Sequence, residues 1–302
     1  MRTTTIGICF ASLQLHVHGQ LSLPFDDGIV TGVSLDSEPL KMFMDTGLSG
    51  TFVVYKDWYE EVYGKGSCKT FEPGCYSCPE KCDPYDKERD VRTFSDGSEI
   101  TSVLHQGTAS IGKSQMTMTF RLIIGFSPGD RIPNGKPKNF LGLGFPTGPS
   151  PETVPRQLFR NGLIKQYAVT ICSPGHVLSF KGTLIFGDWK GLCKVKPTLT
   201  TIPMTEPHKW AFFDSVLSSF GLISSTGHIF TRETPQRSLV YDTGAYSVAL
   251  PKAIFETVLN QIVTFTSADN GSDVYVKTSR NTWFIEEKGL DFLPVLTFSV
   301  GD

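Results

Sequence analysis

Residues 42–54 read Met-Phe-Met-Asp45-Thr46-Gly47-Leu-Ser-Gly-Thr-Phe-Val-Val, and residues 239–250 read Leu-Val-Tyr-Asp242-Thr243-Gly244-Ala-Tyr-Ser-Val-Ala-Leu. In both stretches a short apolar run meets an Asp-Thr-Gly triplet, and the chain then turns apolar again. One such triplet is typical of an ordinary turn, because Asp and Gly are favoured turn residues. Two copies in the same apolar setting, far apart in the chain, indicate a shared role instead.

The apolar flanks predict that the carboxyl groups of Asp45 and Asp242 are buried, and a buried charge must be compensated. Two acids compensate each other when they share one proton, since two adjacent carboxylates repel each other in a poorly solvated site. The ionised partner then takes a proton from a water molecule held between them, while the protonated partner donates a hydrogen bond to a scissile carbonyl. This chemistry requires no metal, no other cofactor and no covalent intermediate.

The two triplets, their separation and their flanks resemble the pepsin-like aspartic protease family (peptidase family A1), over most of residues 28–302. The resemblance implies an all-β fold with minor helices, in which two lobes each contribute one catalytic loop. It implies that Asp45 and Asp242 are the catalytic pair. It also implies that threonine hydroxyls and close-packed glycines support the two loops, at Thr46, Gly47, Thr243 and Gly244.

Further stretches carry the same resemblance. The turn at Phe94-Ser95-Asp96-Gly97-Ser98 resembles the hairpin flap that closes over substrate, and its Asp-Gly pair favours a hairpin. Phe94 stands where the family's flap usually carries tyrosine, so the ring is kept and the orienting hydroxyl is lost. Residues 140–144, Phe-Leu-Gly-Leu-Gly, resemble the strand that supports the first loop, and residues 182–187 and 293–298 match other characteristic stretches.

The residues directly after the triplets depart from the family pattern. The family usually places Ser or Thr there, whose hydroxyl donates to the carboxylate, whereas this chain has Leu48 and Ala245. A hydrogen bond to the ionised form lowers a pKa. The loss of both donors therefore predicts a raised apparent pKa for the pair and activity displaced toward neutral pH.

We expect three segments along the chain. The apolar run at residues 6–15 follows Arg2 and leads to Val17-His18-Gly19, which is typical of a signal peptide over residues 1–19; a buried first strand is the alternative. An N-terminal lobe over residues 20–180 carries the first triplet and the flap, and a C-terminal lobe over residues 181–302 carries the second. Little sequence follows Asp242, so we expect the second lobe to be incomplete, and we find no basic pro-segment before the first lobe.

Of the seven cysteines, Cys9 lies in the expected signal peptide, and the remaining six suit an oxidising compartment. Four of them predict a loop held by two disulfides whose pairing the sequence leaves open: Cys68, Cys75, Cys78 and Cys82. Cys172 and Cys193 are available for a third bridge. A zinc or redox site at Cys75-x-x-Cys78 is the alternative, disfavoured because no histidine is near it in sequence. Asn270-Gly271-Ser272 is a glycosylation sequon, which agrees with secretion.

Composition agrees with a β-rich chain. Its 29 glycines, 19 prolines and 12% aromatic residues favour short strands and tight turns. The best helix candidates are residues 157–162 and 252–261. A net charge of -2 gives no broad positive field for nucleic acid, and no apolar run is long enough to span a membrane. We expect a monomer, secreted to the extracellular space or carried to an acidic vacuolar or lysosomal compartment.

The sequence therefore predicts an aspartic endopeptidase that binds its polypeptide substrate in an extended conformation between the lobes. The first alternative is an aspartic-protease-like peptide-binding protein that is catalytically impaired, favoured by Leu48, Ala245 and Phe94. The second is a disulfide-stabilised extracellular β protein in which both triplets are turns. Serine-hydrolase and zincin motifs (Gly-x-Ser-x-Gly and His-Glu-x-x-His) are absent from the sequence.

Overall fold

The computed structural model describes residues 19–80, 82–129, 134–145, 153–173, 180–188, 193, 202–204, 213–245, 248–270, 276–279, 282–285 and 287–301. Strands predominate among these residues and helices are few, which confirms the expected mostly β class. The expected signal peptide lies outside the described residues, apart from Gly19.

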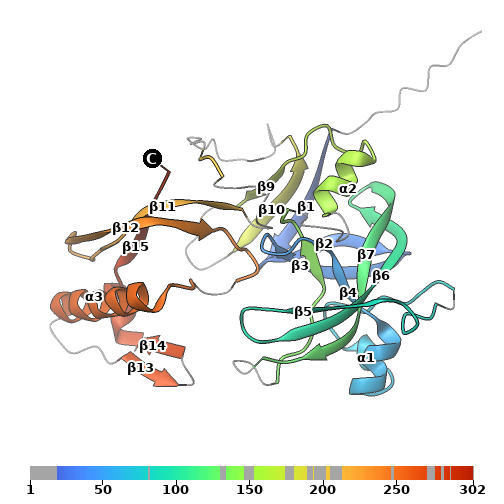
Figure 1. Cartoon of the computed structure of the whole chain (residues 1–302), viewed down its shortest axis with the longest axis horizontal. Helices are drawn as coiled ribbons and strands as arrows, with labels where there is room; N and C mark the ends of the chain where they lie inside the picture. The colour runs from blue at the N-terminus through green and yellow to red at the C-terminus, as the bar shows by residue number, and fades with distance from the viewer. Residues whose placement is uncertain are drawn as a thin grey trace, which may run out of the picture.

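A ten-stranded sheet forms the larger part of the molecule, in the order β5-β6-β7-β4-β8-β3-β2-β1-β10-β9 (Figure 1). Most neighbouring strands are antiparallel, whereas β3 pairs with β8 and β4 pairs with β7 in parallel. In chain order the strands are β1 (Gln20–Asp26), β2 (Ile29–Leu35), β3 (Glu38–Asp45), β4 (Phe52–Val54), β5 (Arg89–Thr93), β6 (Glu99–Ile111), β7 (Ser114–Ser127), β8 (Phe140–Gly142), β9 (Val169–Cys172) and β10 (Lys181–Gly187).

Burial along these strands follows the side-chain period of two. In β1, Leu21, Leu23 and Phe25 are buried and alternate with exposed residues, as expected for a strand with one face on the core. Residues 42–45 in β3 and all of β4 are buried on both faces. The first triplet therefore follows one of the most deeply packed strands of the sheet.

The sheet extends past residue 180. β10 pairs along the whole of β1, from Gln20 opposite Gly187 to Asp26 opposite Lys181, and β9 pairs with β10 at the edge. Helices α1 (Lys56–Tyr63) and α2 (Val154–Arg160) and the short 3-10 helix η1 (Ser67–Lys69) belong to this part of the chain.

A second, smaller unit lies beside the first (Figure 1). Its three-stranded sheet has the order β12-β11-β15, formed by β11 (Asp214–Ile223), β12 (Ile229–Val240) and β15 (Val295–Val300). Helix α3 (Lys252–Asn270) packs on this sheet, where Ile254 and Val258 meet Phe220 and Leu222 in a separate core. The hairpin β13 (Val276–Ser279) and β14 (Thr282–Ile285) and the 3-10 helix η2 (Glu287–Phe292) complete the unit.

Both expected helices exist with different bounds. Helix α2 begins three residues earlier than expected because Pro155 occupies its first turn, where the missing N–H costs nothing. Helix α3 extends nine residues further than expected, because Ile262 and Phe265 continue the apolar face that packs on the sheet. Asn270 is the last residue of α3, and the rest of its sequon lies outside the described residues.

Three disulfides are present, which confirms the expected use of these six cysteines. They join Cys68 to Cys75, Cys78 to Cys82, and Cys172 to Cys193. The segment with the first two bridges is fixed to the sheet through Tyr76, which bridges to Tyr55 after β4 and is fully buried.

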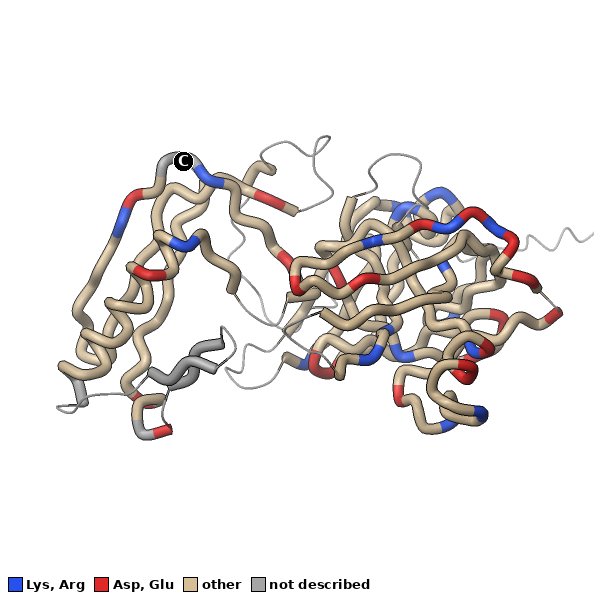
Figure 2. Tube along the Cα trace, turned by 60° about the horizontal axis from the view of Figure 1, so that its bottom comes forward, with Lys and Arg blue, Asp and Glu red and all other residues tan. Residues whose placement is uncertain are grey.

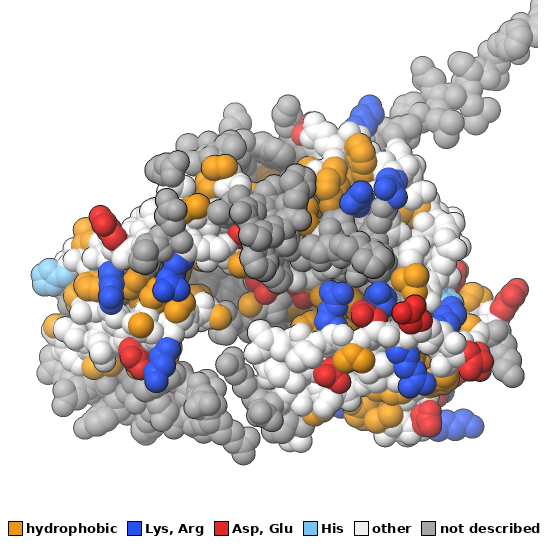
Figure 3. Space-filling view, viewed as in Figure 1, with side chains coloured by type: hydrophobic (Ala, Val, Ile, Leu, Met, Phe, Trp, Pro, Cys, Tyr) orange, Lys and Arg blue, Asp and Glu red, His pale blue; other side chains and the backbone are white. Residues whose placement is uncertain are grey.

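Basic and acidic residues are interspersed over the described part of the molecule. They are scattered along the trace in Figure 2 and intermixed on the face shown in Figure 3. In the part of the chain that the structure describes, no helix combines the length and the apolar character that a membrane crossing requires.

Asn139 connects the cysteine-rich segment to the sheet. Its side chain is 1% exposed, accepts a hydrogen bond from Val54 N (2.8 Å), and donates to the carbonyls of Pro73 and Gly74 (2.9 Å each). Replacing it would leave these three backbone groups without their side-chain partner in the interior.

We predict that Asn139→Ala lowers the free energy of unfolding by about 3 kcal/mol, measured by urea denaturation. The matched control is Asn161→Ala at an exposed residue whose side chain donates to the Gln157 carbonyl and, at 3.8 Å, to the Met116 sulfur, where the loss should stay below about 1 kcal/mol. Equal losses in the two variants would contradict the role given to Asn139.

Candidate active site

The two Asp-Thr-Gly loops are cross-linked by their threonines. The Thr46 hydroxyl donates to the Tyr241 carbonyl (2.8 Å) and accepts from Thr243 N (2.9 Å). In return, the Thr243 hydroxyl donates to the Met44 carbonyl (3.0 Å) and accepts from Thr46 N (3.1 Å). Each threonine therefore bonds to backbone groups of the opposite loop. The expected loop-support residues Thr46 and Thr243 are brought together.

The cross-link places the carboxyl groups of Asp45 and Asp242 side by side. Gly47 N donates to Asp45 Oδ1 and Gly244 N donates to Asp242 Oδ1, both at 2.8 Å. A Cβ at Gly47 would lie 2.8 Å from the Asp242 carboxyl atoms, and a Cβ at Gly244 would lie 2.5–2.6 Å from those of Asp45. Both glycines are therefore required, because each carboxyl occupies the space next to the opposite loop.

The two acids sit in unequal surroundings. Asp45 is only 6% exposed, whereas Asp242 is exposed. Burial, followed by the neighbouring charge of Asp242 and a hydrogen bond to it, raises the pKa of Asp45 from its ordinary 3.8 to about 7. The backbone N–H groups of Gly47 and Leu48 act in the opposite direction and do not offset these causes. Asp45 therefore keeps its proton to a higher pH than an ordinary aspartate does.

Strand β8 supports the first loop from behind. Gly142 stands opposite Asp45 in the parallel pairing of β3 with β8. Leu143 N donates to the Asp45 carbonyl (2.8 Å) and Gly144 N donates to the Leu48 carbonyl (3.0 Å). Within the described residues, β12 pairs with β11 alone, so the loop of Asp242 receives no such strand from behind.

The expected flap is a tight turn between β5 and β6. Phe94 N donates to the Ser98 carbonyl (2.8 Å), and Asp96 Oδ1 accepts from both the backbone N and the hydroxyl of Ser98. Gly97 adopts a φ of +83°, which favours glycine, while Ser95 lies exposed at the tip. These bonds fix the shape of the turn.

The ring of Phe94 connects this turn to the first loop. It stacks on Phe140 in β8 with ring centroids 5.5 Å apart, and Phe140 meets Phe43 edge-on. Phe43 precedes Asp45 by two residues in β3 and so shares its face of the sheet. The flap turn is therefore tethered to the strands that hold Asp45.

The positions after the triplets offer no hydroxyl to the carboxylates. Leu48 is 4% exposed and belongs to the core, whereas Ala245 is exposed. The raised pKa of Asp45 agrees in direction with the expectation from the sequence. Its largest cause is burial rather than the missing donors. The apolar flanks predicted burial of both carboxyls, which is correct for Asp45 and wrong for Asp242, because Asp242 follows a strand of the small three-stranded sheet and stays exposed.

Sequence reasoning missed several contributors. The carbonyls of Met44 and Tyr241 complete the threonine cross-link, although any residue type supplies a carbonyl and only their positions before each Asp could have indicated them. It also missed His105, which lies beside Cys78 and Cys82 in the one metal-compatible cluster found among the described residues.

Comparison with known proteins covered family models and curated sequences. Neither models of protein families nor curated proteins give a match. The evidence for function therefore lies in the site itself.

The raised pKa of Asp45 predicts a pH-dependent stability. Between about pH 4 and pH 7 the unfolded chain ionises Asp45 while the folded protein keeps it protonated, so this group's contribution to stability is lost as pH rises through that window. An asparagine side chain cannot ionise, and its amide oxygen can still accept the hydrogen bond from Gly47 N. We predict that Asp45→Asn is more stable than wild type by roughly 1–3 kcal/mol at pH 7.5.

Urea denaturation at pH 7.5 and pH 3.5 measures this difference, which should vanish or reverse at the lower pH. Asp86→Asn, at an exposed carboxyl, is the matched control and should show no comparable gain at pH 7.5. A gain of the same size at both pH values would contradict the raised pKa.

The threonine cross-link predicts non-additive losses. Thr46→Val and Thr243→Val each remove a hydroxyl that donates one hydrogen bond and accepts another, and each should cost about 2 kcal/mol of unfolding free energy. The double variant should lose less than the sum, since both hydroxyls belong to one network. Thr46→Ser keeps the hydroxyl and serves as the control; additive losses in the cycle would argue against a shared network.

Proposed function

We propose that this protein is an aspartic-type endopeptidase of the pepsin-like kind. The single observation that carries the proposal is the pair of carboxyls, Asp45 and Asp242, set against each other by two reciprocally bonded Asp-Thr-Gly loops. Simple turns have no need of this arrangement. Two like-charged acids set side by side cost stability, so their retention calls for a chemical use.

In the proposed mechanism the two acids have different tasks. Asp45 carries the shared proton, because burial and the charge of Asp242 raise its pKa to about 7, and it donates a hydrogen bond to the scissile carbonyl. Asp242, the more exposed partner, accepts a proton from the water molecule that attacks this carbonyl. As the C–N bond breaks, Asp242 gives its proton to the leaving amine nitrogen and Asp45 takes its proton back from the former carbonyl oxygen, so no covalent intermediate with the enzyme forms.

The proposed substrate is a polypeptide in extended conformation. Such a chain would lie between the two units beneath the flap turn at residues 94–98, with main-chain hydrogen bonds giving affinity. Phe94 offers its ring and no hydroxyl, so the flap covers the substrate without orienting it through a side-chain oxygen. The two sheets with separate cores, each carrying one triplet loop, support the finer assignment to a bilobal pepsin-like fold.

We further propose an oxidising location, either the extracellular space or an acidic vacuolar or lysosomal compartment. The three disulfides support it, because such bridges persist outside the reducing cytosol.

One observation favours a second candidate, a peptide-binding protein of the same fold with impaired catalysis. Asp242 and the adjacent Ala245 are exposed, whereas the matching Asp45 and Leu48 are buried. An exposed carboxylate holds its water molecule less firmly than one enclosed by protein donors. A protein with this defect would still present the flap and the sheet edges to an extended peptide.

We predict that the protein cleaves an unstructured polypeptide and that pepstatin inhibits the cleavage. Activity should fall as pH rises through about 7, because Asp45 then loses the proton it must donate. Asp45→Asn and Asp242→Asn should each lower the rate at pH 5.5 by at least about 1,000-fold, while Asp86→Asn should leave it unchanged. Mass spectrometry of the fragments over a pH series measures all of these outcomes.

Two results would decide against the endopeptidase. Cleavage that persists in either Asn variant would reject the Asp45 and Asp242 pair. Binding of the polypeptide without any fragment, across the whole pH series, would establish the peptide-binding alternative instead.

A further inference from the structure

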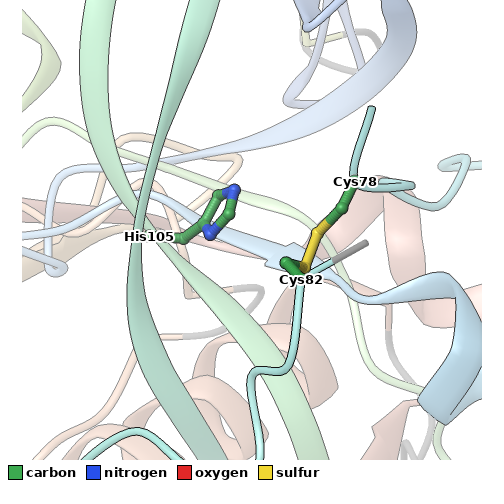
Figure 4. A group of neighbouring side chains, drawn as sticks. All are labelled: Cys78, Cys82 and His105. Atoms are coloured by element: carbon green, nitrogen blue, oxygen red, sulfur yellow. A yellow bond between two sulfur atoms is a disulfide. The ribbon is translucent and has the colours of Figure 1, made fainter. Parts of the chain in front are cut away.

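A second group of reactive side chains lies outside the candidate active site. Cys78 and Cys82 come from the segment before β5, and His105 comes from β6 (Figure 4). The two sulfur atoms and an imidazole nitrogen lie within 4.8 Å of one another. The sulfurs are joined as a disulfide, and the His105 ring extends from its strand toward them (Figure 4).

Neighbouring groups fix which nitrogen of His105 carries the proton. The Tyr76 hydroxyl has one proton and lies 2.6 Å from Asp36 Oδ2, to which it donates. The same hydroxyl lies 3.0 Å from His105 Nε2 and must therefore accept a hydrogen bond from it. In the neutral ring, Nδ1 is then left with the free lone pair.

Nδ1 of His105 is the ring nitrogen that remains available as a ligand. It is buried and has no hydrogen-bond partner among the described residues. A buried acceptor without a partner costs free energy, so its presence calls for an explanation. The disulfide beside it offers no proton to accept, since both sulfurs are bonded to each other.

We propose that reduction of this disulfide creates a metal site, in which Cys78, Cys82 and His105 bind a soft divalent cation of the zinc type. Two thiolates and one neutral imidazole form a ligand set that zinc accepts, with a water molecule in the fourth position. The inference depends on neither the Asp45 and Asp242 pair nor the proposed peptidase activity.

The spacing of the three ligands suits a tetrahedral ion. Zn–S bonds of about 2.3 Å and Zn–N bonds of about 2.0 Å place the ligand atoms roughly 3.5–3.8 Å apart in a tetrahedron. The ligand atoms now lie within 4.8 Å of one another, so only small movements would bring them to these distances. The sulfurs must move apart once their bond breaks, and Cα atoms 6.1 Å apart leave room for that movement.

The surroundings of His105 match those of a metal-binding histidine. Such histidines usually donate their second N–H to an oxygen, which fixes the ring orientation and strengthens the other nitrogen as a ligand. Here the chain from Nε2 through the Tyr76 hydroxyl to Asp36 supplies this support, and Asp36 is itself held by Thr108 N at 2.8 Å. The ring also packs edge-on against Phe120.

The formation of the site balances as two steps. A dithiol delivers two electrons and two protons to the disulfide and becomes a disulfide itself, whereas a phosphine delivers two electrons, takes oxygen from water to become its oxide, and leaves the two protons of that water to the thiols. The cation then displaces both thiol protons as it binds the two thiolates and Nδ1. Oxidation reverses the sequence and expels the ion, so the site is occupied only when the bridge is open.

The test uses the full chain, reduced with a phosphine that is then removed, and titrated with Co²⁺ alone. We expect one equivalent of Co²⁺ per chain with sulfur-to-cobalt charge-transfer absorption, displaced by Zn²⁺, and no such absorption in the oxidised protein. The double variant Cys78→Ser, Cys82→Ser should lose it while the other five cysteines remain. Circular dichroism follows the fold in each state.

Two further variants separate a ligand from a packing residue. His105→Phe keeps an aromatic ring against Phe120 and the oxidised disulfide, and should weaken Co²⁺ binding by at least about tenfold. Tyr76→Phe keeps the buried ring but removes the acceptor for Nε2, and should weaken binding by about tenfold.

Three outcomes would overturn the proposal. Reduced wild type that binds no Co²⁺, whether folded or unfolded, would reject the site. Equal binding by the double cysteine variant would assign the ion to other sulfurs. Unchanged affinity in His105→Phe would remove the histidine from the ligand set.

Discussion

The exchange of hydrogen bonds between Thr46 and Thr243 is the constraint on which the site depends. The two sheets share no strand among the described residues, so the arrangement of the acids relies on contacts between the two units. The cross-link satisfies backbone groups of both loops at once, and Phe145 packs on Phe213 nearby with ring centroids 4.7 Å apart. Because every bond crosses from one loop to the other, neither loop keeps this geometry alone.

The same triplet has unequal environments in the two units, and this inequality gives the acids different properties. Asp45 follows a strand buried on both faces and is supported by β8, so burial dominates its proton affinity. Asp242 follows a strand of a three-stranded sheet with a small core and remains exposed. The two carboxyls of the pair therefore differ in their exposure to water, although the same triplet carries both.

The sequence predicted what local chemistry determines. The resemblance located a strand within residues 140–144, where β8 lies, and Asp-Gly located the turn at residues 94–98. Helix ends were wrong because they depend on tertiary packing, as Ile262 and Phe265 illustrate in α3. The approach of His105 to Cys78 and Cys82 was missed because the fold of the cysteine-rich segment against β6 is not a property of sequence spacing.

The glycines of the triplets explain why the repetition was informative where a single copy was not. In an ordinary turn, glycine is selected by a positive φ, but Gly47 and Gly244 do not have one. What excludes a side chain at each position is the carboxyl group of the other loop. The third residue of each triplet is therefore dictated by the first residue of its partner, so the two copies constrain each other across the molecule as independent turns would not.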